Sequence, residues 1–493
     1  MAIRAESIFF DDEAGGTLQT RIKRRIVSGI LSGQFAPGER LPSSRALARH
    51  LGISRITVTI AYSDLVADDY LEARARSGYF VSHTVPEAPH VGPDRTAGET
   101  ALDWSRLLGH RSPAPRPITR PPDWPRYPYP FIYGQSDPAL FDHQNWRLCA
   151  LRALGQRDFD GLASDQYEDD DPLLVEYIRR NILTRRGISA RAENVLITMG
   201  AQNALWIAAQ LLLSQRRTAV IEAPGYPGLR EVLRQTRCHT REVAVDGHGL
   251  PPEAIPDAAD VVFVTPSHQS PTNVTMPLER RRALLRLAAE RGFIVVEDDY
   301  EFELSFAQAL SPSLKSMDRA GVVIHVGSFS KSLFPGLRLG YIVAPEAFIR
   351  EARALRSSVL RHPPGLMQRT VAHFLSLGHY EAQVNRMRKA YRARRAAMAE
   401  AIAEHGLTIA GTDPGGGSSF WMAAPEGVDT EALARALHAR GVVIEPGHAF
   451  FEDAAPPRHF YRLAYSSIDS ADIPRGIALI AEELARSGSN GAV

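Results

Sequence analysis

The chain lacks the features that mark secreted, membrane-spanning and metal-binding proteins. It has only two cysteines among 493 residues, Cys149 and Cys238, which stand too far apart for a redox or metal-binding motif. No apolar run approaches the roughly 18 residues of a membrane-spanning helix, and the first residues hold no signal-peptide core. The sixteen histidines are scattered. We therefore predict a cytoplasmic protein with no metal site and no membrane partner.

An excess of charge of one sign is also missing, since 57 lysine and arginine residues stand against 56 aspartate and glutamate residues. The distribution of charge is uneven, however. Residues 18–82 hold ten basic residues against five acidic ones, which gives this segment alone a charge of about +5. A basic segment at one end favours local contact with a polyanion such as nucleic acid.

Composition predicts three regions. A chain of 493 residues exceeds a single hydrophobic core, so two or three domains are expected. Residues 15–82 follow a helical pattern and end in short strand-like stretches. Residues 83–127 contain nine prolines and predict a linker, because proline interrupts helices and strands. Residues 128–487 return to a regular periodicity.

The third region predicts an α/β fold. Apolar β-branched stretches alternate there with amphipathic helices, a pattern typical of a mainly parallel sheet with helices on both faces. The strand-like stretches are "NVLITMG", "TAVIEAPG", "VVFVTPS", "FIVVEDDY", "VVIHVGS" and "LGYIVAP". Ligands of such sheets bind at the carboxyl ends of the strands. From about residue 375, long helices and short strands predict a smaller α+β domain.

Polar residues that follow these strands suit one cofactor, pyridoxal phosphate. It needs a lysine for its aldehyde, an acid for its ring nitrogen, a phosphate cup and a stacking face. Lys331 follows a strand in "GSFSKSLFPGLRLGY". A lone lysine there is usually a surface cation, but "EDDY" brings acids to the same edge, and Tyr226 offers a flat ring. Anion donors come from Ser328, Ser330 and Arg338 and from the helix start at Gly200, Ala201 and Gln202.

Residues 128–487 resemble the fold-type I pyridoxal-phosphate aminotransferases through "ITMGAQNAL", "EAPGYPG", "VTPSHQSPT", "VEDDYEFE", "GSFSKSLFPGLRLGY" and "YRLAY". The resemblance implies that Lys331 forms the internal aldimine. It also implies that Asp298 pairs with the pyridine nitrogen and that Tyr300 donates to the ring hydroxyl. Arg462 is similar to the arginine that holds a substrate carboxylate.

One departure from that family concerns the loop after a central strand. The aminotransferases carry Asn-Pro-x-Gly where this chain has "SPTN", residues 270–273. The asparagine that would contact the ring hydroxyl is therefore absent. His268 or Gln269 is expected to replace it, unless the two only cap their own strand. This departure disfavours an efficient transaminase.

A pair of helices with a glycine turn and a short wing is expected before the linker. The first helix is expected to begin near Ser43, whose hydroxyl can cap it, and the second to begin at Ser54. The pattern "GxRLPSSRxLAxxLGISRxTVxxAYxxL" and the stretch "SGYFV" resemble the winged helix-turn-helix of the GntR regulators. With a recognition helix docked by its N-terminal end, the candidates for DNA contact are Ser44, Arg45, Ser54, Arg55, Thr57, Arg76, Gly78 and Tyr79. Arg49 and Arg74 are expected to face solvent only.

The two halves together resemble the MocR/GabR branch of the GntR family. This implies a homodimeric transcription regulator that binds a double-stranded DNA operator and senses a small amino compound by aldimine exchange at Lys331. An active aminotransferase with a DNA-binding appendage is the alternative, and a sensor of pyridoxal phosphate itself is a third hypothesis. Arg462 favours an effector with a carboxylate or sulfonate, which leaves amino acids, taurine, γ-aminobutyrate and a diamino acid open.

Overall fold

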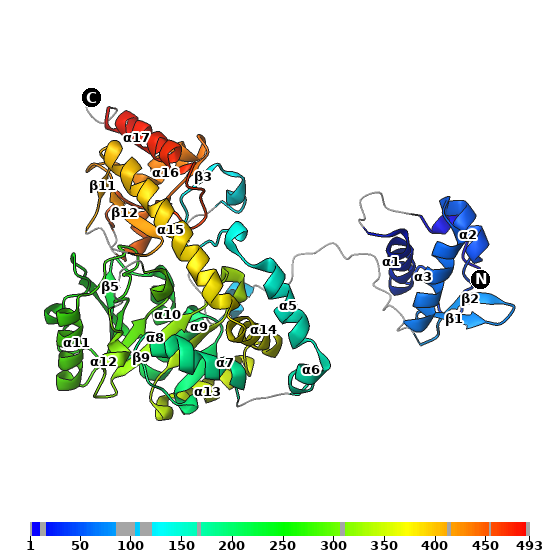
Figure 1. Ribbon diagram of the computed structural model, residues 1–493, viewed down its shortest axis with the longest axis horizontal. Helices are drawn as coiled ribbons and strands as arrows, with labels where there is room; N and C mark the ends of the chain where they lie inside the picture. Colours follow the sequence, from blue (N-terminus) through cyan, green and yellow to red (C-terminus); the bar gives the residue numbers. More distant parts are fainter. Residues whose placement is uncertain are drawn as a thin grey trace. The chain divides into compact units, whose positions relative to one another are not determined.

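The chain divides into two compact units, residues 1–111 and residues 112–493, in a computed structural model (Figure 1). The described residues are 2–9, 16–84, 104–108, 121–164, 169–305, 311–411, 416–452 and 455–489. Most of the predicted linker 83–127 lies outside them. Within it, α4 (Trp104–Leu107) forms a helical turn in a stretch without proline.

The core of the first unit, which is called the head below, consists of three helices and a two-stranded wing, and its last two helices and wing follow in the predicted order. Its helices are α1 (Leu18–Leu31), α2 (Ser44–Leu51) and α3 (Arg55–Ala67), and its strands are β1 (Leu71–Arg74) and β2 (Gly78–Val81). The two strands pair as an antiparallel hairpin. All three of these helices contribute to one buried cluster, to which Ile8 also belongs. The head therefore takes in residues that precede the predicted start at residue 15.

Local interactions explain where these helices begin and end. Ser43 Oγ accepts a hydrogen bond from the Ala46 amide at 3.1 Å, and Ser54 Oγ accepts one from the Ile56 amide at 3.2 Å. Each serine thus caps a helix, and the cap at Ser43 was predicted. Gly52 ends α2 with a φ of 66°, a left-handed conformation that glycine adopts without strain.

The second unit, called the body below, is built on a seven-stranded sheet with the order β4-β10-β9-β8-β7-β5-β6. Neighbouring strands run parallel except β10, which is antiparallel to β4 and β9. The predicted mainly parallel sheet is confirmed. Sequence patterns did not indicate β6, whose side chains alternate between exposed and half-buried over most of the strand. The strands are β4 (Val195–Thr198), β5 (Thr218–Ala223), β6 (His239–Ala244), β7 (Val261–Val264), β8 (Ile294–Asp298), β9 (Val323–Ser328) and β10 (Gly340–Val343).

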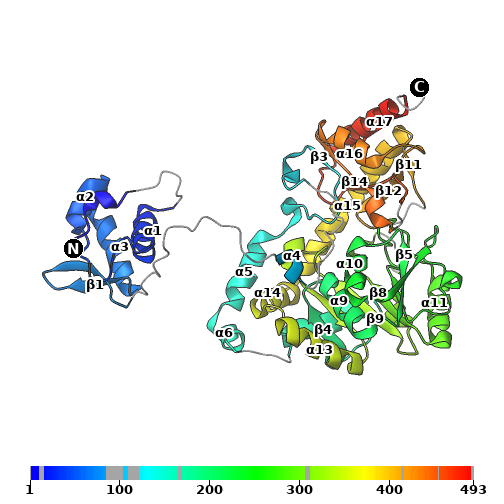
Figure 2. The same cartoon turned by 180° about the vertical axis from the view of Figure 1, so that it is seen from behind.

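Helices bury both faces of this sheet, and Figure 2 shows the face covered by α9 and α13. Val295 packs with side chains of α11 and α12, whereas Val296, its neighbour on β8, packs with side chains of α9, α10 and α13. Because successive side chains point to opposite faces, the strands are apolar throughout. The helices are α9 (Ala201–Leu212), α10 (Pro227–Thr236), α11 (Leu278–Arg291), α12 (Leu314–Met317) and α13 (Glu346–Leu360).

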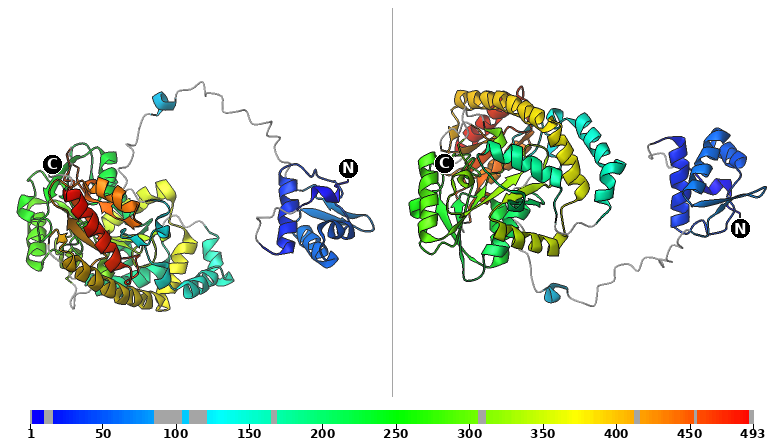
Figure 3. Two further views of the ribbon diagram at one scale, coloured as in Figure 1. Left: turned by 90° about the horizontal axis from the view of Figure 1, so that it is seen from above. Right: turned by 60° about the horizontal axis from the view of Figure 1, so that its bottom comes forward.

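The end of the chain forms a smaller lobe around an antiparallel sheet with the order β11-β12-β15-β14. Figure 3 shows α15 as one long helix, which contacts both α14 and α17. α14 (Gly365–Ser376) belongs to the large lobe and precedes α15. The elements that follow it are α15 (His379–Glu404), β11 (Thr408–Ile409), β12 (Ser419–Ala423), α16 (Thr430–His438), β13 (Val442–Val443), β14 (Glu445–Pro446), β15 (Phe460–Ala464) and α17 (Ile473–Ser489).

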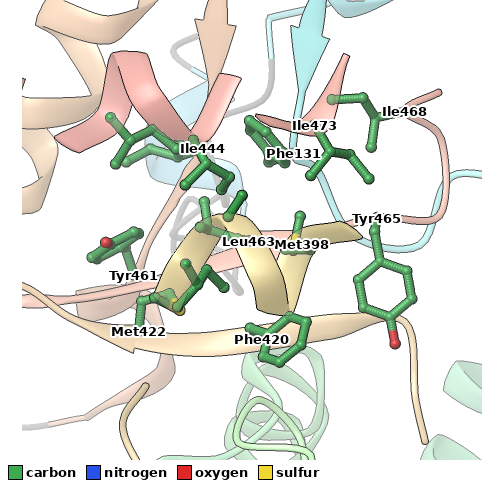
Figure 4. Packing of buried hydrophobic residues seen from close by; sticks show 14 of the residues in the cluster. Phe131, Met398, Phe420, Met422, Ile444, Tyr461, Leu463, Tyr465, Ile468 and Ile473 are labelled. Carbon is green, nitrogen blue, oxygen red and sulfur yellow. The ribbon is translucent and has the colours of Figure 1, made fainter. Parts of the chain in front are cut away.

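The beginning of the body joins this smaller lobe. β3 (Tyr129–Pro130) pairs with β13, and Phe131 enters the hydrophobic core of the lobe (Figure 4). The chain then passes to the large lobe, where α14 packs against α5 and α7. The helices of this passage are α5 (His143–Ala153), α6 (Gln156–Leu162), α7 (Pro172–Tyr177) and α8 (Leu183–Arg185).

Candidate functional site

The sheet register brings the ends of several strands to one edge. Thr198 at the end of β4 and Ser328 at the end of β9 both lie opposite Gly340, the first residue of β10. Asp298 at the end of β8 lies opposite Val326 of β9. The cofactor residues predicted from the sequence follow these strands, so their loops start from this edge.

Two of the three acids in "EDDY" are committed to the fold. Glu297 Oε1 accepts the Leu314 amide at 2.7 Å, and Asp299 Oδ2 pairs with the buried Arg186 at 2.7 Å. Asp298 Oδ1 and Asp299 Oδ1 are both buried without a hydrogen-bond partner among the described residues. Asp298 differs in that no ion pair joins it to another described residue, whereas Asp299 is held by Arg186. A carboxylate buried without a partner is costly, so Asp298 is the acid suited to a ligand.

Burial dominates the electrostatics of Asp298. Burial, and then the charges of Asp299 and Glu222, raise the pKa of Asp298 to about 7, while Lys331 opposes the shift. Burial also raises the pKa of Glu222 to about 7. Glu222 and Asp298 line one small cavity of about 20 Å³ together with Tyr226. A cation at this cavity would therefore lower the pKa of both carboxyls.

Lys331 lies half-buried in the turn after β9. Its Nζ stands 4.0 Å from the ring centroid of Tyr133, within the range of a cation–π contact. Gly134 makes this approach possible, because a Cβ at that residue would stand 2.3 Å from Lys331 Nζ. A small pocket beside the amine is lined by Lys331, Ser330, Glu301, Ser418 and Ser466 among others.

Arg462 on β15 is almost fully buried, with 3% of its surface exposed. Its Nε and Nη2 stand 2.8 and 2.7 Å from Glu445 Oε2, across the β14–β15 register. The guanidinium carbon lies 4.0 Å from the ring centroid of Tyr133 and 4.7 Å from that of Phe450. The Tyr133 ring therefore contacts both Arg462 and Lys331.

The predicted phosphate residues meet at the N-terminus of α9. Ser328 Oγ accepts the Ser330 amide at 3.2 Å, whereas Ser330 Oγ is buried and has no hydrogen-bond partner in the described structure. Arg338 Nη2 donates to the Met199 carbonyl at 3.4 Å, and a Cβ at Gly200 would stand 3.5 Å from that nitrogen. With the helix N-terminus beside Ala201, this is a suitable anion cup.

Tyr226, the tyrosine predicted to stack on the cofactor, is oriented by a neighbour. Tyr226 OH donates to Gln202 Oε1 at 2.7 Å, and Gln202 Nε2 donates to the Gly228 carbonyl at 2.9 Å. Sequence reasoning assigned Gln202 a backbone role only. Its side chain instead links α9 to the start of α10 and fixes the Tyr226 hydroxyl.

The two residues predicted to replace the missing asparagine, His268 and Gln269, differ in their hydrogen bonding. The side-chain nitrogen Nε2 of Gln269 donates to the carbonyls of Pro224 and Ser270, so contacts within the protein already engage this side chain. His268 is buried, and its Nδ1 has no hydrogen-bond partner in the part of the chain that the structure describes. Burial lowers the pKa of His268 to about 4, so the ring is neutral near pH 7. The Tyr300 hydroxyl donates to the His268 carbonyl at 2.9 Å.

Sequence reasoning missed five residues around Lys331 and Asp298. Glu301 is buried, accepts the Ser418 hydroxyl and lies 3.3 Å from the Tyr133 hydroxyl. Burial raises the pKa of Glu301, while Lys331 opposes the shift. The position of Glu301 directly after "EDDY" was a usable signal, whereas Tyr133 and Gly134 come from a distant segment. The missed residues are Tyr133, Gly134, Glu222, Glu301 and Glu445.

In the head, the predicted DNA-contacting arginines Arg45, Arg55 and Arg76 are all exposed. Arg55 Nε donates to Ser44 Oγ at 3.4 Å, which joins the starts of α2 and α3. Ser54 is a helix cap, and Thr57 is half-buried. Tyr79 packs edge-on against Tyr62 with centroids 4.8 Å apart, so part of its ring belongs to the core. Gly78 begins β2.

The donor chemistry of the body fits pyridoxal phosphate. Asp298 Oδ1 suits a protonated ring nitrogen, and Ser330 Oγ with Arg338 suits phosphate oxygens. Lys331 is half-buried, and its amine follows β9 at the same edge of the sheet. When bound, the cofactor would supply an electrophilic aldehyde carbon and a ring that accepts electrons.

A DNA-binding head of this kind joined to such a body defines a class of transcription regulators. The model of the bacterial regulatory proteins of the gntR family matches residues 18–81, and that of aminotransferase class I and II matches residues 167–480. The chain belongs to the family of transcription regulators that combine these two domains. Its fold is thus a GntR-type helix-turn-helix plus a fold-type I aminotransferase-like α/β domain, as predicted.

Relatives of known name cover the whole chain. The chain is 59% identical over 484 residues to the HTH-type transcriptional regulator TauR of Rhodobacter capsulatus, and the match covers 98% of this chain and 100% of that one. It is 29% identical to the probable rhizopine catabolism regulatory protein MocR of Rhizobium meliloti, over 99% of this chain and 97% of the relative.

A solved structure shares the fold of the body. The α-aminoadipate aminotransferase LysN of Thermus thermophilus, complexed with N-(5'-phosphopyridoxyl)-L-leucine, superposes with a TM-score of 0.71 and 28% identity. The match covers 79% of this chain and 100% of that one. That structure thus shares the fold of the body and holds a phosphopyridoxyl compound.

Two other properties concern the described residues alone. None of their helices combines the length and the apolar character needed to cross a membrane. Among the same residues, no cluster of three or more histidine, cysteine, aspartate or glutamate side chains has the arrangement of a metal site.

Proposed function

We propose that the protein is a pyridoxal-phosphate-dependent transcription regulator whose DNA binding responds to a small amino compound. The primary amine of this effector takes the place of Lys331 Nζ at the cofactor aldehyde carbon, and the lysine is released as an amine. One observation carries the proposal: Lys331 Nζ and the Arg462 guanidinium carbon each stand 4.0 Å from the centroid of one ring, that of Tyr133. An amino compound that takes the place of Lys331 would thus have the Arg462 cation close enough to bind its acidic group.

The pair of Arg462 with Glu445 shapes this specificity. A guanidinium has five N–H donors, and Glu445 Oε2 engages Nε and Nη2. Glu445 therefore fixes the plane of the guanidinium while it offsets the positive charge. An effector carboxylate or sulfonate would use the other donors of Arg462. It would also meet repulsion from Glu445, which favours an effector that adds a strong contact elsewhere, such as the bond at the cofactor.

Spectral titration tests the proposal. We expect visible absorbance of the holoprotein to shift when an amino acid or aminosulfonate is added, and DNA affinity to change over the same concentration range. Arg462→Met should raise the half-saturating concentration at least tenfold for acidic amines while leaving that of a simple alkylamine unchanged. An equal change for both compounds would contradict the role of Arg462.

An active aminotransferase is the second candidate, because the body spans 100% of the LysN structure and Lys331 and Asp298 are the groups that transamination also needs. Incubation with amino donors and keto acids separates the two. Many turnovers per site would favour the enzyme, whereas a spectral shift without product would favour the regulator. A change in DNA affinity on adding pyridoxal phosphate alone, with no further effect of amines, would favour the third hypothesis.

We also propose that the protein acts as a homodimer in the cytoplasm. The observation in favour is an apolar stripe of exposed leucines, Leu148, Leu151 and Leu154, along α5 and its end. An exposed stripe of this kind commonly marks a protein interface. Sedimentation should give a dimer for the native chain, and Leu151→Glu should shift it toward the monomer. A native monomer at micromolar concentration would contradict the proposal.

A further inference from the structure

The recognition helix α3 exposes large apolar side chains to solvent. Ile56 is 70% exposed and Ile60 is 42% exposed. The two residues are four apart and therefore share one helix face. The other apolar face of α3 is already used, since Val58, Ala61, Tyr62 and Leu65 are buried in the head. The isoleucines thus form a second, unpartnered face, which keeps apolar surface in water.

The charges near this face suit a polyanion. Arg55 precedes Ile56 and is tied to Ser44 of α2. Neither α2 nor the first nine residues of α3 contain an acid. The acids of α3 and its end, Asp64 and Asp68, lie at the other end of the helix and pair with Lys23 of α1. The exposed isoleucines are therefore set in a neutral-to-basic surface.

We propose that Ile56 and Ile60 read thymine in the major groove through its 5-methyl group. The inference rests on the DNA-binding role of the head and adds a base preference to it. Isoleucine cannot hydrogen-bond, and thymine is the base that presents an apolar group at its major-groove edge. Residues at the N-terminal end of a recognition helix reach base edges. Four residues of helix span about 6 Å, so the two thymines stand about two base pairs apart in each half-site.

Deoxyuridine, which is thymine without the methyl group, is the direct probe. Duplexes bound by the full-length holoprotein are first selected from a random library. Each thymine of the selected half-site is then replaced by deoxyuridine, one at a time, and affinity is measured by fluorescence anisotropy. We expect two positions in the half-site where the replacement weakens binding by about fourfold each, the factor for losing one buried methyl-sized group. Ile56→Ala should weaken binding similarly and abolish sensitivity at one of these positions alone. Ile60→Ala should do the same at the other position.

Three controls keep the result specific. Leu31→Ala removes an apolar side chain that is 51% exposed at the end of α1 and should leave every deoxyuridine effect in place. Ile56→Ala should keep the native salt dependence, whereas Arg55→Ala should reduce its slope by about one unit, as expected for a lost phosphate contact. Circular dichroism melting of each variant reports whether the head is folded.

The outcomes separate this inference from the DNA-binding role itself. If deoxyuridine is tolerated at every position, or if Ile56→Ala and Ile60→Ala retain full sensitivity, the methyl contact is refuted while DNA binding stands. If Ile56→Ala instead changes the oligomeric state without changing base preference, the face belongs to a protein contact. If the library yields no enriched sequence, and Arg45→Ala and Arg55→Ala bind DNA as the native protein does, the role of the head fails as well.

Discussion

The head and the body place their proposed binding groups in opposite environments. Arg45, Arg55 and Arg76 of the head are exposed, whereas Asp298 and Arg462 of the body are 9% and 3% exposed. Charges on the exposed surface are hydrated whether or not a partner is present. Charges in the body need compensation inside the protein, because burial without a partner is costly.

This difference determines how the stability and the binding of each region change when a charged side chain is removed. In the body, the partner of a deleted charge is left buried and alone, so both stability and binding change. In the head, the remaining groups stay solvated, and binding to a polyanion falls by one contact among many. The body is therefore suited to recognise one small molecule, and the head is suited to a large surface with repeated charge.

The largest expected effect is that of Lys331→Ala in the body. This change should abolish the visible absorbance of the holoprotein, because the amine that bonds the cofactor aldehyde is lost. The chain has only four lysines, Lys23, Lys315, Lys331 and Lys389. Borohydride reduction followed by peptide mass spectrometry should therefore place the cofactor on Lys331. The exposed Lys389 gives the matched control, since Lys389→Ala should keep both colour and label. Colour that survives Lys331→Ala would exclude this lysine.

Glu445→Ala should produce the next largest effect. Loss of one partner from a buried ion pair typically costs about 3–5 kcal/mol, so the body should unfold at clearly lower urea concentration. Asp257→Ala is the control, because the Asp257 side chain in the pair with Arg291 is 94% exposed, and exposed pairs contribute about 1 kcal/mol or less. Equal losses of stability for the two variants would show that burial does not determine how much an ion pair contributes to stability.

The pH dependence of the cofactor-free protein should report Asp298. Its carboxyl keeps a proton up to about pH 7 in the folded state but loses it near pH 4 when unfolded. The folded state thus binds more protons between these values, and stability falls as pH rises, by at most about 1.4 kcal/mol per pH unit for this group. Asp298→Asn should flatten the slope in denaturation measured from about pH 4 to 7. Glu222 should leave a residual slope, because its pKa is raised similarly. An unchanged slope would mean that Asp298 is ionised in the folded protein.

The sequence was enough to predict the parts of the structure that rest on local chemistry. The serine cap at Ser43, the start of a helix at Ser54 and the mainly parallel sheet are confirmed. A capping hydroxyl acts within three residues, and a strand buried on both faces is apolar along its length. The edge strand β6 was missed because its side chains are mostly exposed or half-buried, which leaves no continuous apolar run.

The rest of the candidate site depends on contacts between distant segments. Tyr133 reaches Lys331 and Arg462 because β3 pairs with β13 on the smaller lobe. Glu445 faces Arg462 only through the β14–β15 register. No local pattern encodes either pairing. The exposure of Ile56 was hidden as well, since the sequence does not say which apolar side chains of a short helix the core takes.

The smallest expected effect lies on the head, where Arg45 and Arg49 allow a comparison within one helix. Both are exposed on α2, one turn apart, but Arg45 belongs to the proposed DNA-contacting set and Arg49 does not. Arg45→Ala should weaken operator binding about tenfold or less and lower the slope of log affinity against log salt by about one. Arg49→Ala should change neither, and both variants should keep native cofactor absorbance. Equal salt slopes for the two variants would mean that general basic charge, not a docked α2, holds the head on DNA.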